Sequence, residues 1–250
     1  MNNLLLQNKI CVVTGTSRGI GKAITEEFVN QGAIVYANAR ELGSIDQWAS
    51  SFEGVKPGMV YPQYYDINDY GAVKNAVLHI KEKHNSIDVL VNNASLRNNS
   101  LLGAISRDAI ESVFSTNVFA ALNLMQLVSR IMTRNKRGSI INLSSIAGVG
   151  GVGGQVLYSA TKGAVISMSR AAAKELAGYG IRVNVIAPGL TDTEGFIREN
   201  GQYVEEKLKT IGFGRLATPK EIADVCVFLA SDMSCFISGE TINVNGCALM

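Results

Sequence analysis

A strand, a glycine-rich turn and a helix follow one another near the N-terminus, and no other feature restricts the possible fold as strongly. Residues 10–14 (Ile-Cys-Val-Val-Thr) are apolar and mostly β-branched, which predicts a buried strand. Residues 15–21 (Gly-Thr-Ser-Arg-Gly-Ile-Gly) form the turn, and residues 22–30 have a helical pattern. Glycines let a backbone approach a pyrophosphate, while a helix N-terminus offers free N–H groups and a positive dipole end. In this context the turn predicts a dinucleotide-binding site.

Strand-like and helical segments alternate along the rest of the chain. This alternation predicts a parallel sheet with helices on both faces. We find no internal repeat, low-complexity tract or linker in the 250 residues. The chain is therefore expected to form a single doubly wound, Rossmann-type α/β domain over residues 1–250, with a mostly parallel seven-stranded sheet. The other predicted strands are 33–37, 59–65, 87–91, 139–143, 181–186 and 241–244, and the other predicted helices are 44–52, 70–83, 117–134 and 158–177.

Composition and charge argue against several classes of protein. The net charge is only +2 and no long basic run occurs, so nucleic-acid binding has little support. No run of 18 apolar residues and no signal-peptide pattern is present, so we expect a soluble, cytoplasmic protein without membrane contact. The four cysteines form no C-x-x-C pair, which favours free thiols over disulfides. His79 and His84 have no partners at metal-ligand spacing, so both are expected on helix surfaces and no metal is expected.

Tyr158 and Lys162 are the strongest candidates for chemistry. Their spacing of four residues puts both side chains on one face of a helix. A free tyrosine has a pKa of about 10, and a neighbouring lysine cation lowers that pKa. The pair can then give or take a proton near neutral pH if a carbonyl or an alcohol is within reach. Because Tyr and Lys also meet at this spacing on ordinary solvated helices, the assignment depends on the other motifs.

Those other motifs resemble the short-chain dehydrogenase/reductase family over nearly the whole chain. Residues 14–21 resemble its cofactor motif, and residues 92–94 (Asn-Asn-Ala) resemble its N-N-A-G motif. Ser95 stands where the family usually has glycine, which is expected to alter the loop because serine tolerates positive φ poorly. Residues 188–193 resemble its P-G-x-x-x-T segment. The resemblance implies a catalytic tetrad, with Ser145 at the usual 13 residues before Tyr158: Asn117, Ser145, Tyr158 and Lys162.

The resemblance also implies a cofactor site, and the charges suggest which cofactor binds. The end of the second strand reads Asn38-Ala39-Arg40, without the acid that would bind the ribose 2′-hydroxyl of NAD. Arg40 and Arg18 can instead pair with a 2′-phosphate, which favours NADPH/NADP+, although both could be ordinary surface charges. Asp66 could equally cap a turn, and Thr193 a helix. The expected cofactor contacts are Gly15, Thr16, Ser17, Arg18, Gly19, Ile20, Gly21, Arg40, Asp66, Ile67, Asn93, Ala94, Tyr158, Lys162, Pro188, Gly189, Thr191 and Thr193.

The mechanism implied by the resemblance is reversible hydride transfer between the cofactor and a carbonyl carbon. Tyr158 would give its proton to the carbonyl oxygen, and Ser145 would donate a hydrogen bond to the developing oxyanion. Lys162 would bind the nicotinamide ribose, and Asn117 would hold a water that links Lys162 to solvent, or would cap or kink a helix. Ser144 is a competing serine, but strand alternation turns it the other way.

The substrate is constrained less tightly. Residues 153–155 and 214–246 are similar to bacterial 3-oxoacyl-[acyl-carrier-protein] reductases, which act in fatty-acid biosynthesis. In those enzymes basic residues dock the acidic carrier protein, and Lys136 and Arg137 could do so here, whereas Tyr179 stands where they tend to have arginine. A dehydrogenase of a sugar, steroid or other small secondary alcohol, and a non-catalytic NADPH sensor, remain as alternatives. Residues 190–211 should cover the substrate; expected contacts are Ser145, Gln155 and Tyr158, with Leu96, Arg97, Val149, Val152 and Val156 as further lining.

Two predicted helices suggest how the chain assembles. Residues 117–134 and 158–177 are apolar or small on more than one face. Such helices are expected to be buried on more than one face. One face would cover the sheet and another would meet a second subunit, so we expect a homotetramer, the family's common state, or a homodimer.

Overall fold

The computed structural model describes residues 4–52, 58–194 and 204–248, which form one sheet covered by helices. The sheet has seven strands in the order β3-β2-β1-β4-β5-β6-β7. Within the described residues every neighbouring pair of strands is parallel, which confirms the predicted fold class. The order reverses beside β1, where β2 lies on one side and β4 on the other; ligands bind beyond the carboxyl ends of strands at such a point. The strands are β1 (Ile10–Thr14), β2 (Ile34–Ala39), β3 (Met59–Tyr64), β4 (Val89–Asn92), β5 (Gly138–Leu143), β6 (Ile181–Pro188) and β7 (Thr241–Val244).

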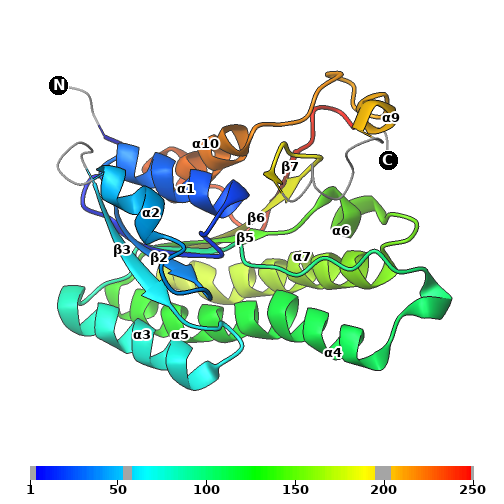
Figure 1. Ribbon diagram of the computed structural model, residues 1–250. Helices are drawn as coiled ribbons and strands as arrows, with labels where there is room; N and C mark the ends of the chain where they lie inside the picture. The colour runs from blue at the N-terminus through cyan, green and yellow to red at the C-terminus, as the bar shows by residue number, and fades with distance from the viewer. Residues whose placement is uncertain (1–3, 53–57, 195–203, 249–250) are drawn as a thin grey trace.

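The helices form two layers around this sheet (Figure 1). In that view α1, α2 and α10 lie above the sheet, while α3, α4, α5 and α7 lie below it. Short 3-10 turns are also present: η1 (Ser50–Phe52), η2 (Leu102–Ala104), η4 (Ala177–Tyr179) and η6 (Asp232–Ser234). The helices are α1 (Gly19–Asn30), α2 (Asp46–Ala49), α3 (Tyr70–His84), α4 (Arg107–Phe114), α5 (Ala120–Asn135), α6 (Ile146–Gly150), α7 (Val156–Leu176), α9 (Val204–Leu208) and α10 (Pro219–Ala230).

Each face of the sheet packs against its own helix layer. Along β1, Cys11 and Val13 belong to the core shared with α1 and α10, whereas Ile10 and Val12 belong to the core shared with α3, α5 and α7. Side chains alternate along a strand, so a strand that is buried on both faces must be apolar at nearly every position. This explains why β1 reads as an unbroken apolar run, and it leaves polar residues to gather at the strand ends.

Several element boundaries differ from the sequence-based expectation. The long helix predicted to begin at residue 117 begins ten residues earlier, because the Ser106 hydroxyl accepts a hydrogen bond from the Ala109 N–H (3.1 Å) and caps α4. A π-helical turn, η3 (Ser115–Phe119), then separates α4 from α5. The helix α10 was not predicted, although Thr218 and Glu221 form a capping box with Pro219 at the first turn.

Cysteines and histidines settle two smaller expectations. Cys11 and Cys226 are buried, Cys235 and Cys247 are exposed, and all four are free thiols, as predicted. His84 is not a plain surface residue, because its Nε2 lies 2.8 Å from the Tyr36 hydroxyl and burial lowers its pKa.

The described residues contain no cluster of His, Cys, Asp or Glu suited to a metal ion. Among them, too, no helix is both long enough and apolar enough to cross a membrane.

Candidate active site

The glycine-rich turn between β1 and α1 is braced by the segment that follows β4. Asn93 Nδ2 donates to the carbonyl oxygens of Thr14 (2.9 Å) and Gly15 (3.0 Å). A Cβ placed on Gly21 would overlap both the Gly15 carbonyl and the Asn93 amide. Gly15 itself has φ +70°, a left-handed conformation that favours glycine. The close packing of backbone against backbone at the first turn of α1 therefore requires glycine at these positions.

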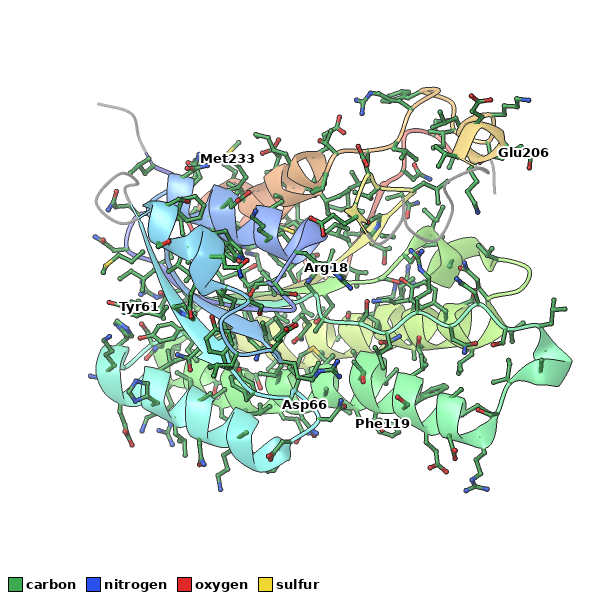
Figure 2. All side chains as sticks on the ribbon, in the orientation of Figure 1. Arg18, Tyr61, Asp66, Phe119, Glu206 and Met233 are labelled. Atoms are coloured by element: carbon green, nitrogen blue, oxygen red, sulfur yellow. The ribbon has the colours of Figure 1, made fainter. Side chains whose placement is uncertain are left out.

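A groove of about 540 Å³ opens above this turn, at the carboxyl ends of the strands. Arg18 and Asp66, both labelled in Figure 2, line it from the N-terminus of α1 and from the segment after β3. Thr16 does not line it; that side chain is fully buried and donates to the Asn38 carbonyl (3.0 Å), which fixes the turn to β2. The predicted cofactor residues that line this groove are Gly15, Ser17, Arg18, Gly19, Ile20, Gly21, Arg40, Asp66, Ile67, Asn93, Ala94 and Thr193.

The shape and charge of this groove suit an NADP cofactor. Its floor is the glycine turn and the N-terminus of α1, which offer backbone N–H groups to a pyrophosphate. Arg18 and Arg40 are both exposed in it, and β2 ends at Ala39 without a carboxylate. Asp66 keeps the capping role that its sequence context allowed, because its Oδ1 accepts from the Asn68 N–H (2.8 Å). The residues present therefore fit a dinucleotide that carries an additional phosphate on its ribose.

A smaller cavity, of about 230 Å³, continues from the groove toward α7. Four residues line both spaces, namely Ile20, Asn93, Ser95 and Thr193. The cavity therefore lies where the far end of a bound dinucleotide would reach. Three of the four predicted catalytic side chains line it together with three predicted cofactor contacts: Ser145, Tyr158, Lys162, Pro188, Gly189 and Thr191.

Ser145 and Ser144 both border the cavity, but only one is available for chemistry. The Ser144 hydroxyl is buried and donates to the Lys162 carbonyl (2.8 Å). Ser145 is the N-cap of α6, and its Oγ accepts from the Ala147 N–H (3.2 Å). An accepting hydroxyl keeps its own proton to donate, so Ser145 can still offer a hydrogen bond to an oxygen in the cavity. The geometry thus favours Ser145, in line with the spacing argument.

Lys162 is buried beside Tyr158 at the base of the cavity. It is 3% exposed, and its Nζ donates to the Leu143 carbonyl (2.8 Å) and lies 5.7 Å from the centre of the Tyr158 ring. Burial, and next the positive charge of Arg97, lower the pKa of Lys162 to about 7. In the protein alone Lys162 is therefore only partly cationic at neutral pH, unlike the permanent cation that the sequence suggested.

Replacing Lys162 by Met is expected to raise the free energy of unfolding of the cofactor-free protein by about 2 kcal/mol at pH 6. The folded pKa is about 7, whereas an unfolded lysine titrates near ~10.4. Below pH 7 the folded protein must bury a charged Lys162, which lowers the free energy of unfolding. As the pH rises from 7 to about 10 this destabilisation disappears, because the lysine of the unfolded chain then loses its proton too. Urea unfolding at both pH values checks this. If the variant is stabilised as much at pH 10 as at pH 6, or is destabilised at pH 6, then Lys162 is not a buried group with a lowered pKa.

Gly148 helps to determine the position of Lys162. A Cβ at Gly148 would overlap the backbone and Cβ of Lys162, so only glycine lets α6 lie against α7 at this point. The sequence showed a glycine-rich run here without indicating which glycine mattered. The close approach identifies Gly148 as the one that sets the depth of Lys162.

Asn117 does not line the cavity; it fixes the loop above it. Its Oδ1 accepts from the Leu96 N–H (2.7 Å), and its Nδ2 donates to the Leu96 carbonyl (2.9 Å) and to Thr161 Oγ1 (3.0 Å). Asn117 lies in the π turn η3, where the regular i→i+4 ladder is interrupted. A π turn thus interrupts the helix at Asn117, and both amide atoms of its side chain have protein hydrogen-bond partners. Its role in holding a water stays a prediction.

The sequence matches the family described as short chain dehydrogenase over residues 9–203. The chain belongs to the short chain dehydrogenase family. Relatives agree along nearly the full length: a 3-oxoacyl-[acyl-carrier-protein] reductase of Thermotoga maritima is 38% identical over 96% of this chain and 98% of its own. A 3α-hydroxysteroid dehydrogenase of Mediterraneibacter gnavus is 31% identical over 98% of both chains. The predicted family is therefore confirmed.

A solved structure supports the choice of cofactor class. A candidate NAD(P)-dependent gluconate 5-dehydrogenase from Beutenbergia cavernae, with bound NADP, has a TM-score of 0.91, 29% identity and 98% coverage of both chains. This short chain dehydrogenase is accordingly an oxidoreductase of CH–OH groups that uses a nicotinamide cofactor.

The remaining substrate predictions have mixed outcomes in this dehydrogenase. Gln155 does not line the cavity; its Nε2 donates to Asn99 Oδ1 (3.0 Å) instead. Ser95 does line it, and its φ is not positive, so the serine is accommodated without strain. Residues 195–203 of the predicted covering segment lie outside the described residues. Lining residues that were not predicted are Asn38, Ala39, Tyr65, Asn68, Ser112, Thr116 and Glu194 in the groove, and Leu143 in the cavity.

A larger hollow of about 760 Å³ opens at the opposite end of the sheet, where the strands begin. Its charges are largely matched, since Lys9 pairs with Asp232 (2.9 Å) and Arg137 pairs with Asp88 (3.1 Å). Arg137 precedes β5, whereas Ser145 follows it, and a strand of this length spans about 20 Å. Lys136 and Arg137 therefore do not border this chain's own reaction cavity, and their carrier-docking role stays a prediction.

Proposed function

We propose that this short chain dehydrogenase is an NADPH-dependent reductase of 3-oxoacyl thioesters, including those on an acyl carrier protein. The observation that carries the proposal is the continuity of the two spaces. A groove that holds Arg18 and Arg40 runs into a cavity that holds Ser145, Tyr158 and Lys162. The similarity to 3-oxoacyl-[acyl-carrier-protein] reductases along nearly the whole chain supports the substrate.

Each side chain in the cavity has a physical role in this reaction. NADPH, when bound, supplies the hydride for the carbonyl carbon. Tyr158 donates its proton to the carbonyl oxygen, and Ser145 donates a hydrogen bond that stabilises negative charge on that oxygen. Lys162 lies beside the Tyr158 ring, where it favours the phenolate that remains after proton transfer. Asn117 acts indirectly, as a positioning residue. Its side chain holds the loop at Leu96 and, through Thr161, the helix that carries Tyr158.

The test is NADPH oxidation with a short 3-oxoacyl thioester, with NADH and simple ketones assayed beside it. Rapid turnover with the thioester and NADPH, and much slower turnover with NADH, is the expected result. Tight NADPH binding without thioester reduction would reject the substrate and leave the cofactor assignment intact.

A second candidate is the NADP-dependent oxidation of a sugar, steroid or other small secondary alcohol. The NADP-bound candidate gluconate 5-dehydrogenase and the hydroxysteroid relative favour it. Reduction of NADP+ in the presence of D-gluconate or a 3α-hydroxysteroid, at a rate above that of the thioester reaction, would make this the better assignment.

Assembly into a homotetramer, or a homodimer, in the cytoplasm belongs to the same proposal. The outer side of the α4–α5 row exposes Ile110, Phe119 and Leu122, and Phe119, labelled in Figure 2, is 55% exposed. Large apolar side chains grouped on one helix row are typical of subunit contacts. Light scattering at micromolar concentration should give a mass well above the 26.7 kDa of one chain; a mass equal to that of one chain would reject the assembly.

A further inference from the structure

Ser95 lies at the junction where the cofactor groove meets the reaction cavity. The residues that line both spaces are Ile20, Asn93, Ser95 and Thr193. Of these four, Ser95 is exposed, whereas the other three are half-buried. A hydroxyl group can both donate and accept a hydrogen bond. The Ser95 side chain is therefore open to a ligand that extends from the groove into the cavity.

The order of residues along the two spaces indicates which part of NADPH reaches this junction. Arg40 borders the groove directly after β2, where it can meet a 2′-phosphate. The glycine turn and the N-terminus of α1 offer N–H groups to the pyrophosphate, and Tyr158 lines the cavity where the nicotinamide ring is needed. The nicotinamide ribose connects the pyrophosphate to that ring. It is therefore the part of NADPH that we expect beside Ser95.

The backbone on both sides of Ser95 is held in place. Thr14 Oγ1 accepts hydrogen bonds from the two backbone N–H groups that precede it, at 3.0 and 3.1 Å. The Asn117 side chain binds the N–H (2.7 Å) and the carbonyl (2.9 Å) of Leu96, the residue after it. These contacts keep Ser95 at the junction before the cofactor arrives, so little conformational entropy is lost when its hydroxyl binds a ligand.

We propose that the Ser95 hydroxyl forms a hydrogen bond with the nicotinamide ribose of NADPH and so strengthens cofactor binding in this chain. The glycine that is usual at this position in the family has no side chain for such a contact. The φ of Ser95 is not positive, so its side chain fits here without backbone strain. One hydrogen bond between uncharged groups, exchanged for a bond to water, is expected to tighten binding about 3- to 10-fold. This inference rests on the proposed function only in taking NADPH as the ligand of the groove.

The test is the dissociation constant of NADPH, measured by fluorescence titration without substrate. Ser95→Ala and Ser95→Gly both lack the hydroxyl, and each should weaken NADPH binding by about 3- to 10-fold. Ser95→Thr keeps a hydroxyl and should stay within about twofold of the wild type. Ser100→Ala is the matched control and should leave the constant unchanged, because Ser100 follows β4 in the same loop and lines neither space.

Adenosine 2′,5′-bisphosphate locates the contact, because it carries the 2′-phosphate but lacks the nicotinamide ribose. Its affinity should be the same for the wild type and for Ser95→Ala. Unchanged NADPH binding in Ser95→Ala would overturn the proposal. A weakening confined to Ser95→Gly would also overturn it, because the effect would then come from a more flexible backbone and not from the hydroxyl. Equal weakening of NADPH and of the bisphosphate would overturn the assignment to the ribose.

Turnover of 3-oxobutanoyl-coenzyme A by the wild type separates this inference from the proposed function. Tight NADPH binding that Ser95→Ala weakens, without thioester reduction, rejects the thioester substrate and keeps the role of Ser95. Thioester reduction with NADPH, together with unchanged NADPH binding in Ser95→Ala, rejects the role of Ser95 and keeps the thioester function.

Discussion

Replacing Tyr158 by Phe is expected to lower kcat by about 10³-fold while NADPH affinity changes by less than about threefold. The variant loses the phenolic hydroxyl, which lines the described cavity on a ring that lies beside the buried Lys162. It keeps the ring that packs in α7, and the residue is 7% exposed, so the fold should be undisturbed. Steady-state kinetics and NADPH fluorescence titration measure the two quantities separately.

The matched control is Tyr179→Phe. Tyr179 follows α7 at its far end, is 49% exposed and borders neither the groove nor the cavity, so its hydroxyl should be dispensable. Two results would count against the assigned role of Tyr158. One is retention of more than a tenth of the wild-type kcat in Tyr158→Phe; the other is loss of NADPH binding together with activity.

Replacing Arg40 by Asp is expected to reverse the cofactor preference. We expect kcat/KM for NADPH to fall by about 100-fold, because a charge-assisted contact to the 2′-phosphate is lost and a repulsion is added. The value for NADH should rise by about fivefold, since a carboxylate after β2 can accept hydrogen bonds from the ribose hydroxyl. Arg40 directly follows β2 and lines the groove, so the new carboxylate would stand where an NAD enzyme places one.

Arg40→Met separates attraction from repulsion. It should lower kcat/KM for NADPH by about 10-fold without raising kcat/KM for NADH, because it removes a positive charge and adds no negative one. If Arg40→Asp still prefers NADPH by the wild-type ratio, Arg40 does not meet the phosphate. Arg18, on the α1 side of the groove, would then be the residue to change next.

Much of the site was predictable because its signals are local. The strand β1, the glycine turn and α1 are consecutive, so their order alone indicates a backbone cradle for a dinucleotide. Tyr158 and Lys162 share a helix, which sets their relation by its repeat. Ser145 and Thr193 follow strands whose carboxyl ends must meet at one edge of a parallel sheet.

Other features had no local signal, because they arise where distant segments meet. Nothing in the sequence near Asn117 indicates that its side-chain amide hydrogen-bonds the Leu96 backbone, since the two residues belong to different segments of the chain. The π turn at Ser115–Phe119 is a departure from a pattern that reads as ordinary helix. Lys136 and Arg137 formed a basic cluster in the sequence, yet they precede β5 and so lie at the end of the sheet away from the cavity.

Sequence alone determined the fold class, the cradle for the cofactor and the pairing of Tyr158 with Lys162, because strand and helix periods and adjacent residues act over short distances. Tertiary structure decided how deep each group lies and what lies opposite it. Lys162 is buried because Gly148 lets α6 pack against it, and burial is what lowers its pKa to about 7. Arg97 stands beside Tyr158 because a loop after β4 is tied to η3 and α7. Such distances depend on how whole elements pack, which no short stretch of residues encodes.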